Sequence, residues 1–180
     1  GAPGSRLVAM SVVLMGVAGS GKSTVGQALA GKLGWRFIDA DDHHSPASVA
    51  KMKQGVPLDE ADRQPWLDRL NDLLRQSQQR DEPVILACSA LKRAYRSRLA
   101  RSLPQPLVWV YLKVDPATAR DRLARRQNHF FGPDLVASQF DALEEPASDA
   151  VIIDATASEA QIVDEILAFL RRIHPCRTGE

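Results

Sequence analysis

The sequence predicts a single α/β domain built on a mainly parallel sheet. Three observations carry this prediction. The length of 180 residues suits one domain with a sizeable core. Short apolar runs alternate with helix-like segments along the chain, and no repeat, low-complexity segment or long linker divides it. We expect residues 1–10 to be a flexible lead, residues 11–174 to form the domain, and residues 175–180 to be a flexible tail.

The first strand–helix–strand unit is the clearest part of the pattern. The apolar run at residues 11–15 predicts a buried strand, and the glycine-rich residues 16–21 predict a turn. A helix over residues 22–33 follows, because its apolar side chains recur at helical spacing, and Gly34 suits its end. The apolar residues 35–38 then predict the second strand.

The middle of the chain predicts two helices and a third strand. A short helix over residues 46–54 is expected before the turn at residues 55–57. Apolar spacing from 62 to 80 predicts a long helix with Pro65 in its first turn, where amides lack intrahelical acceptors in any case. The run at residues 84–88 is typical of a buried strand.

The remaining elements continue the alternation. A basic helix over residues 90–102 leads to a strand at residues 107–112, and Pro116 opens an arginine-rich helix. Residues 128–133 break that helix. The last expected elements are a helix ending near residue 143, a strand at 151–153 and a helix at 158–172.

Composition excludes several classes of protein. Apolar residues make up 44% and charged residues 25%, which is ordinary for a globular domain, and no run approaches a membrane span. The net charge of +1 does not support a nucleic-acid binder. Cys88 and Cys176 cannot form a disulfide scaffold and show no zinc spacing. With no signal-peptide pattern, a reducing, cytoplasmic setting is expected.

One motif carries chemistry directly. Residues 16–23, Gly-Val-Ala-Gly-Ser-Gly-Lys-Ser, match G-x-x-x-x-G-K-[ST] between a predicted strand and a predicted helix. In this motif the loop amides and the helix N-terminus bind phosphates. Lys22 is expected to reach the β- and γ-phosphates as a catalytic group, and Ser23 to place its hydroxyl on Mg²⁺. The predicted nucleotide-binding residues are Gly16, Gly19, Ser20, Gly21, Lys22, Ser23 and Thr24.

Two carboxylates follow the second predicted strand. No N-K-x-D tetrad for guanine occurs, and the strand at 84–88 ends in Cys88-Ser89 instead of the usual metal-binding Asp. Asp39 and Asp41 are the nearest candidates, because that strand end faces the same crevice as the glycine-rich loop. On one extended segment both would point to the same side. Asp39 would orient Mg²⁺ through water and Asp41 would accept the proton of an acceptor hydroxyl. The alternative is a solvated, Asp-rich helix cap.

A series of sequence blocks spanning residues 16–146 resembles the gluconate kinase family of P-loop small-molecule kinases. The discriminating blocks are Asp62-Arg63-x-Pro65-Trp66 and residues 88–92, which shikimate and nucleoside monophosphate kinases lack. The sequence departs from the family pattern at Ser45-Pro46, where His followed directly by Pro is expected. The other matching blocks are the phosphate loop and residues 39–44, 51–52, 55–58, 129–130, 138–140 and 143–146.

The resemblance implies a three-layer fold with sheet order 2-3-1-4-5, and transfer of the ATP γ-phosphate to the 6-hydroxyl of D-gluconate. It also implies a mobile lid over about 122–140, with catalytic Arg126 on the phosphates and Arg122 on the nucleotide. Dimerisation is common in the family, although no residue of this chain by itself indicates a homodimer. The implied gluconate-binding residues are Asp41, His44, Arg63, Ser89, Lys92 and Arg96.

Several alternatives remain open at this point. Within the enzymes, the acceptor could instead be shikimate or a nucleoside monophosphate. A nucleotide sensor would use the same loop only to switch conformation, and an RNA binder would use the basic helices. Arg63 and Lys92 could equally be surface charges, and the arginine-rich segment a solvated helix.

Overall fold

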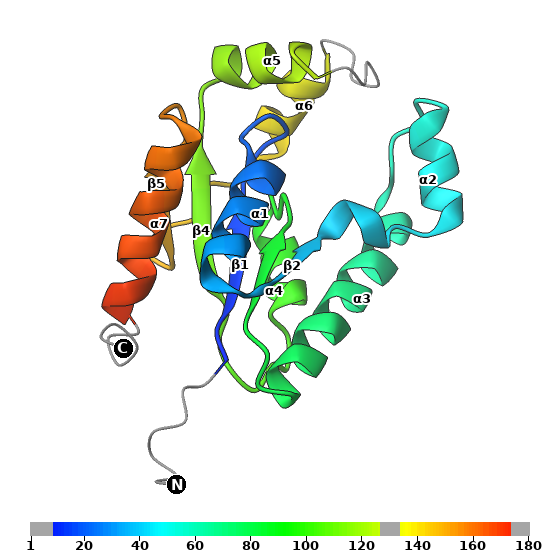
Figure 1. Ribbon diagram of the computed structural model, residues 1–180. Helices are drawn as coiled ribbons and strands as arrows, with labels where there is room; N and C mark the ends of the chain where they lie inside the picture. The colour runs from blue at the N-terminus through cyan, green and yellow to red at the C-terminus, as the bar shows by residue number, and fades with distance from the viewer. Residues whose placement is uncertain (1–8, 127–133, 174–180) are drawn as a thin grey trace, which may run out of the picture.

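The computed structural model describes residues 9–126 and 134–173 (Figure 1). Ala9 and Met10 belong to the domain and not to a flexible lead, because both are buried and the Met10 carbonyl accepts a hydrogen bond from the amide of Val84 at 3.0 Å. The rest of the predicted lead, the predicted tail and part of the predicted lid lie outside the described residues. No helix in the described ranges is long and apolar enough to cross a membrane.

Five parallel strands form one sheet in the order β2-β3-β1-β4-β5, which confirms the expected α/β class and topology. The inner strands β1 and β3 are buried along their whole length, as their uninterrupted apolar sequences predict. The strands are β1 (Ser11–Met15), β2 (Arg36–Asp39), β3 (Val84–Ala87), β4 (Val108–Lys113) and β5 (Ala150–Asp154).

Helices cover both faces of the sheet and its upper end (Figure 1). The helices are α1 (Lys22–Leu33), the 3-10 helix η2 (Ala40–His43), α2 (Pro46–Lys53), α3 (Glu60–Gln79), α4 (Arg93–Leu99), α5 (Pro116–Ala124), α6 (Asp134–Ala142) and α7 (Glu159–Ile173).

Alternation along β1 divides the core into two layers. Val12 and Leu14 belong to the cluster that contains the apolar residues of α1 and α7. Val13 and Met15 point to the other face, where α3 and α4 contribute apolar side chains. Because all five strands run in the same direction, their carboxyl ends meet at one edge of the sheet, which positions the loops that follow β1, β2 and β3 together.

Two helix boundaries differ from the sequence prediction. Helix α3 begins at Glu60 because Asp59 caps it, so Pro65 lies inside the helix beyond the first turn. Helix α4 spans only Arg93–Leu99, and not 90–102, because Ala90 adopts a positive φ of 48° and the chain stays non-helical up to Lys92. The residues after β3 therefore form a loop beside the carboxyl end of the sheet.

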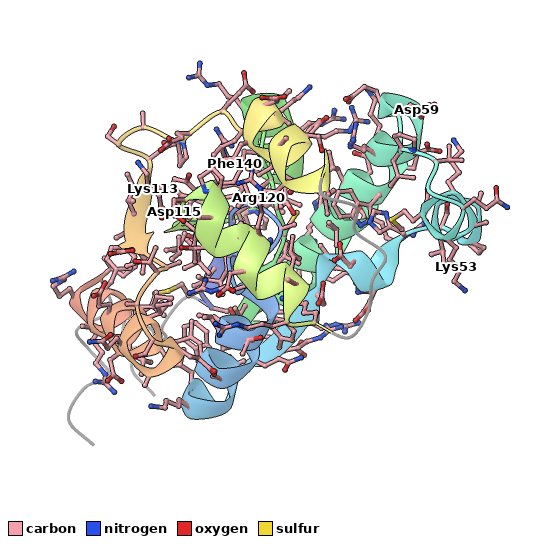
Figure 2. All side chains as sticks on the ribbon, turned by 90° about the horizontal axis from the view of Figure 1, so that it is seen from above. Lys53, Asp59, Lys113, Asp115, Arg120 and Phe140 are labelled. Atoms are coloured by element: carbon pink, nitrogen blue, oxygen red, sulfur yellow. The ribbon has the colours of Figure 1, made fainter. Side chains whose placement is uncertain are left out.

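Figure 2 views the molecule from above that edge and shows α5 and α6 side by side across it. Arg120 and Phe140 mark these two helices. Lys53 and Asp59 lie at a different side of the view, on α2 and at the start of α3. The described parts of the predicted lid, 122–126 and 134–140, therefore lie over the strand ends, and its residues 127–133 are outside the described ranges.

Candidate active site

The glycine-rich loop connects β1 to α1 with the backbone geometry that its sequence requires. Gly19 has a φ of 86°, and a Cβ added there would lie 2.6 Å from the carbonyl oxygen of Ala119 in α5. The position therefore excludes a side chain both by conformation and by space. Gly21 also has positive φ and immediately precedes α1, so the loop delivers its amides to the helix N-terminus.

Lys22 folds back over this loop. Its Nζ donates to the carbonyl oxygens of Gly16 at 3.0 Å and Val17 at 3.1 Å. Burial lowers the pKa of the Lys22 ammonium, with a further lowering from the charge of Arg126 and an opposing effect from Asp41. The lysine thus lies among the charged groups expected for phosphoryl transfer.

Ser23 and Asp39 are hydrogen-bonded across the strand ends, with the Ser23 Oγ 2.8 Å from Asp39 Oδ2. The other oxygen of Asp39 accepts from the amide of Asp41 at 3.0 Å and caps η2. The expectation of one extended segment for Asp39 and Asp41 is therefore wrong, because residues 40–43 turn into a 3-10 helix. Asp39 acts as a cap and still faces Ser23.

A hydroxyl and a carboxylate so placed fit the oxygen-only coordination that Mg²⁺ prefers. No cluster of three or more His, Cys, Asp or Glu side chains suited to a metal occurs among the described residues. Mg²⁺ commonly keeps several waters and binds through one or two protein groups together with substrate phosphates. Ser23 and Asp39 are thus a suitable pair for a nucleotide-bound magnesium ion.

Asp41 projects from η2 into the open site, with 85% of its side chain exposed. His44 Nε2 lies 3.8 Å from Asp41 Oδ1. His44 foremost, and then Lys22 and Arg126, lower the pKa of the Asp41 carboxyl against the opposing effect of desolvation. The carboxylate is therefore held ionised at neutral pH, which is the state that a proton acceptor needs.

His44 is held by a tryptophan of α3. Its ring stacks on Trp66 with centroids 4.3 Å apart, and only 5% of its side chain is exposed. The Trp66 indole donates to the carbonyl of Ala40 at 2.7 Å. Trp66, a residue of one discriminating sequence block, therefore holds both the imidazole and the turn that carries Asp41.

Arg63 and Lys92 come together around one aromatic ring. The Arg63 guanidinium lies 5.6 Å and the Lys92 ammonium 5.8 Å from the centroid of Tyr95. Glu60 joins them: its carboxylate accepts from the Tyr95 hydroxyl at 2.7 Å and from Arg63 at 3.3 Å. Sequence reasoning missed Glu60 and Tyr95, whose only signal is spacing, three residues from Arg63 and Lys92 respectively.

The block around Asp62 has a positioning role. Asp59 and Asp62 form a reciprocal capping box, with each side chain accepting from the other's amide. Asp62 also accepts from Lys51 of α2 at 2.8 Å. These contacts fix the first turn of α3, and with it the direction in which Arg63 projects.

The two arginines near the predicted lid make different contacts. Arg122 donates to the carbonyls of Ser20, at 3.1 Å, and Ala155, so it ties α5 to the phosphate loop and to the loop after β5. Arg122, Arg126 and Thr24 line a cavity of about 350 Å³ that continues past the phosphate loop towards the start of α7. Arg126 also acts electrostatically on Lys22 and Asp41. The cavity thus adjoins the phosphate loop.

Two other residues predicted for the acceptor site, Ser89 and Arg96, make hydrogen bonds with backbone groups of the domain. The carbonyl of Ser89 accepts from the amide of Gly16 at 3.2 Å, which joins the loop after β3 to the phosphate loop. Arg96 is 7% exposed and donates to the carbonyls of Ala90, Leu91 and Glu144. The structure favours a structural role for Arg96, because its donors are satisfied by backbone within the domain.

The doubly covered parallel sheet, the phosphate loop with Lys22 and the Ser23–Asp39 pair define a P-loop kinase. A family model described as an AAA domain matches residues 12–148. The chain is 43% identical over 175 residues to a probable gluconokinase of Mus musculus, covering 88% of this chain and 92% of that protein. It is 44% identical over 142 residues to a gluconokinase of Gluconobacter oxydans, covering 79% of each.

Similarity extends to solved structures. A gluconokinase from Sinorhizobium meliloti 1021 superposes with a TM-score of 0.82 at 40% identity, covering 93% of this chain and 95% of that one. The chain belongs to the gluconokinase family. The resemblance carried by its sequence blocks is thereby confirmed.

Proposed function

We propose that this protein transfers the γ-phosphoryl group of ATP to the 6-hydroxyl of D-gluconate, producing 6-phospho-D-gluconate and ADP. The observation that carries the proposal is the placement, at one edge of the sheet, of a phosphate-binding lysine, an ionised carboxylate and a pair of cations. The position of Lys22 on the glycine-rich loop suits phosphate binding, and the ionised carboxylate of Asp41 suits proton acceptance. Arg63 and Lys92 beside Tyr95 suit recognition of the carboxylate of an acid.

In the proposed reaction the acceptor oxygen forms a bond to the γ-phosphorus as the bond from that phosphorus to the β–γ bridging oxygen breaks. Asp41 takes the proton of the acceptor hydroxyl. Lys22 and Arg126 face the negative charge that spreads over the transferred group, and ADP leaves with the bridging oxygen. Mg²⁺, when bound with ATP, neutralises phosphate charge, and Ser23 and Asp39 would hold it there, Asp39 through water.

Gluconate differs from a neutral sugar by its carboxylate, so its site needs a cation. The two cations beside Tyr95 are the best-placed groups for this task, since Arg63 offers a planar fork for a carboxylate and Lys92 a point charge. Glu60 holds Arg63 by a 3.3 Å contact. Asp41, His44 and Ser89 complete the proposed acceptor side, whereas Arg96 supports it from within the domain.

The alternatives differ in what stimulates turnover. Release of ADP from MgATP would be measured with D-gluconate, shikimate, AMP or no acceptor. The proposal expects strong stimulation by gluconate alone. Stimulation by another acceptor would keep the kinase chemistry and overturn the assigned substrate. Binding of ATP without stimulation by any acceptor would favour the nucleotide-sensing alternative.

A variant pair tests the acceptor site itself. Arg63→Ala is expected to raise the KM for gluconate by about tenfold or more, because a charge-assisted contact is lost, while the KM for ATP stays within about twofold. Arg80→Ala, an exposed change at the C-terminal cap of the same helix, is the matched control. Equal effects of the two changes on the KM for gluconate would remove Arg63 from the acceptor site.

A further inference from the structure

A side chain from α6, within the predicted lid, reaches the phosphate loop. Gln139 of α6 accepts a hydrogen bond at its Oε1 from the amide of Ala18, with N and O 3.0 Å apart. The two residues are 121 positions apart in sequence. An amide N–H can only donate, so the contact defines the orientation of the Gln139 carboxamide.

The peptide unit that Gln139 holds is also the one that holds Lys22. The N–H of this unit belongs to Ala18, and its C=O belongs to Val17. That carbonyl accepts from Lys22 Nζ at 3.1 Å and from the amide of Ser20 at 3.1 Å. A rotation of this single peptide would therefore break the Gln139 contact and move an oxygen that holds the lysine.

The opposite end of this connection is anchored to the loop after β3. Just beyond α6, the amide of Glu144 donates to the Leu91 carbonyl at 2.8 Å, and the Glu144 carboxylate accepts from the amide of Arg93 at 2.8 Å. Arg96 donates to the Glu144 carbonyl at 2.9 Å. The segment from Gln139 to Glu144 thus contacts the nucleotide loop at one end and the acceptor-side loop at the other.

We infer that Gln139 is a positioning residue for phosphoryl transfer, acting through the Val17–Ala18 peptide to set the place of Lys22. It does not touch substrate in this inference. Through this contact the position of Lys22 depends on the position of α6. The chain just beyond α6 is in turn hydrogen-bonded to the loop that carries Ser89 and Lys92. The inference rests on the proposed function where it takes the bound phosphates to be those of ATP. The hydrogen bond between Gln139 and Ala18 does not depend on that function.

The test compares Gln139→Met, which keeps the length of the side chain and removes the acceptor, with Gln139→Glu, which keeps an acceptor oxygen. Gln139→Met is expected to weaken MgATP binding and to lower kcat/KM for ATP by about tenfold, the range of one net hydrogen bond, with the KM for gluconate within about twofold. Gln139→Glu should lie closer to the parent protein. Asp141→Asn, an exposed change on the same helix, is the control.

Hydrogen exchange at the Ala18 amide gives a second measurement that needs no turnover. Faster exchange at this amide in Gln139→Met, with restored protection in Gln139→Glu, is expected. Unchanged MgATP binding together with unchanged Ala18 exchange in Gln139→Met would overturn the inference. So would equal losses in Gln139→Met and Asp141→Asn. Because binding of MgATP and amide exchange require no acceptor, these results are independent of whether gluconate is the substrate.

Discussion

Trp66 and His44 stack with their ring planes inclined by only 18°, and this contact joins the long helix α3 to the turn that carries Asp41. The same indole donates to the Ala40 carbonyl, at the start of that turn. Arg69 of the same helix donates to the His43 carbonyl, at the end of that turn. Helix α3 thus carries Arg63, which we propose for the acceptor site, and one turn later holds the turn that carries the proposed base.

Replacement of Lys22 tests the nucleotide side. Lys22→Ala should lower kcat by about 10²–10³-fold, because a preorganised cation aimed at developing charge is removed. Folding should be retained, since the lysine bonds only to loop carbonyls. Steady-state kinetics with a parallel measurement of thermal unfolding would check this. A Lys32→Ala control on the exposed end of α1 should keep full activity, and parent-like kcat in Lys22→Ala would exclude the lysine from transfer.

Replacing Asp41 and replacing its neighbour Asp42 give a matched pair of variants. Asp41→Asn is expected to abolish transfer with MgATP affinity largely kept, because the amide cannot accept the hydroxyl proton. Asp42→Asn, an equally exposed change in the same 3-10 helix, should be active. Rapid-quench measurement of the transfer step separates chemistry from product release. If Asp41→Asn turned over at the rate of the parent protein, another group would have to be the base.

The pH dependence follows from the direction of the Asp41 shift. Its pKa lies below the ordinary value of 3.8, chiefly because of His44, so the base remains deprotonated through the neutral and mildly acidic range. We expect kcat/KM for gluconate to show no acid limb from Asp41 above pH 5. Removing the main cause with His44→Gln should move the acid limb to higher pH. A limb that stayed in place or moved lower would contradict the assigned cause.

The phosphate loop could be predicted from sequence because its chemistry lies in eight consecutive residues whose backbone does the binding. The acceptor side could be predicted only in part, because Glu60 and Tyr95 come from separate helices and nothing in the sequence shows that these two residues meet. Arg96 shows a second limit: a buried arginine that bonds backbone carbonyls has the same sequence signature as one that binds substrate.

The contact between Lys51 and Asp62 should make the stability of the fold depend on pH. The contact with Lys51 and the capping contacts lower the pKa of Asp62, so the unfolded chain binds the proton more tightly than the folded one. The stabilisation is therefore complete above the ordinary value of 3.8 and is lost as pH falls through the lower folded value. Asp62→Asn should lower the Tm at pH 7, with a difference that narrows towards pH 3. A pH-independent difference would mean that the charge does not contribute.

Arg96 and Arg98 both lie on α4, and replacing each compares a buried arginine with one in an exposed ion pair. Arg96→Ala removes the arginine donor from the carbonyls of Ala90 and Glu144, and one of the two donors from the Leu91 carbonyl, and should destabilise the fold by about 2–3 kcal/mol. Arg98→Ala loses an exposed pair with Asp68 and should change stability much less. Denaturant unfolding of both variants measures the difference. If Arg96→Ala instead kept the parent stability and raised only the KM for gluconate, Arg96 would belong to the acceptor site after all, and the bonds that occupy its guanidinium would have to open when substrate binds.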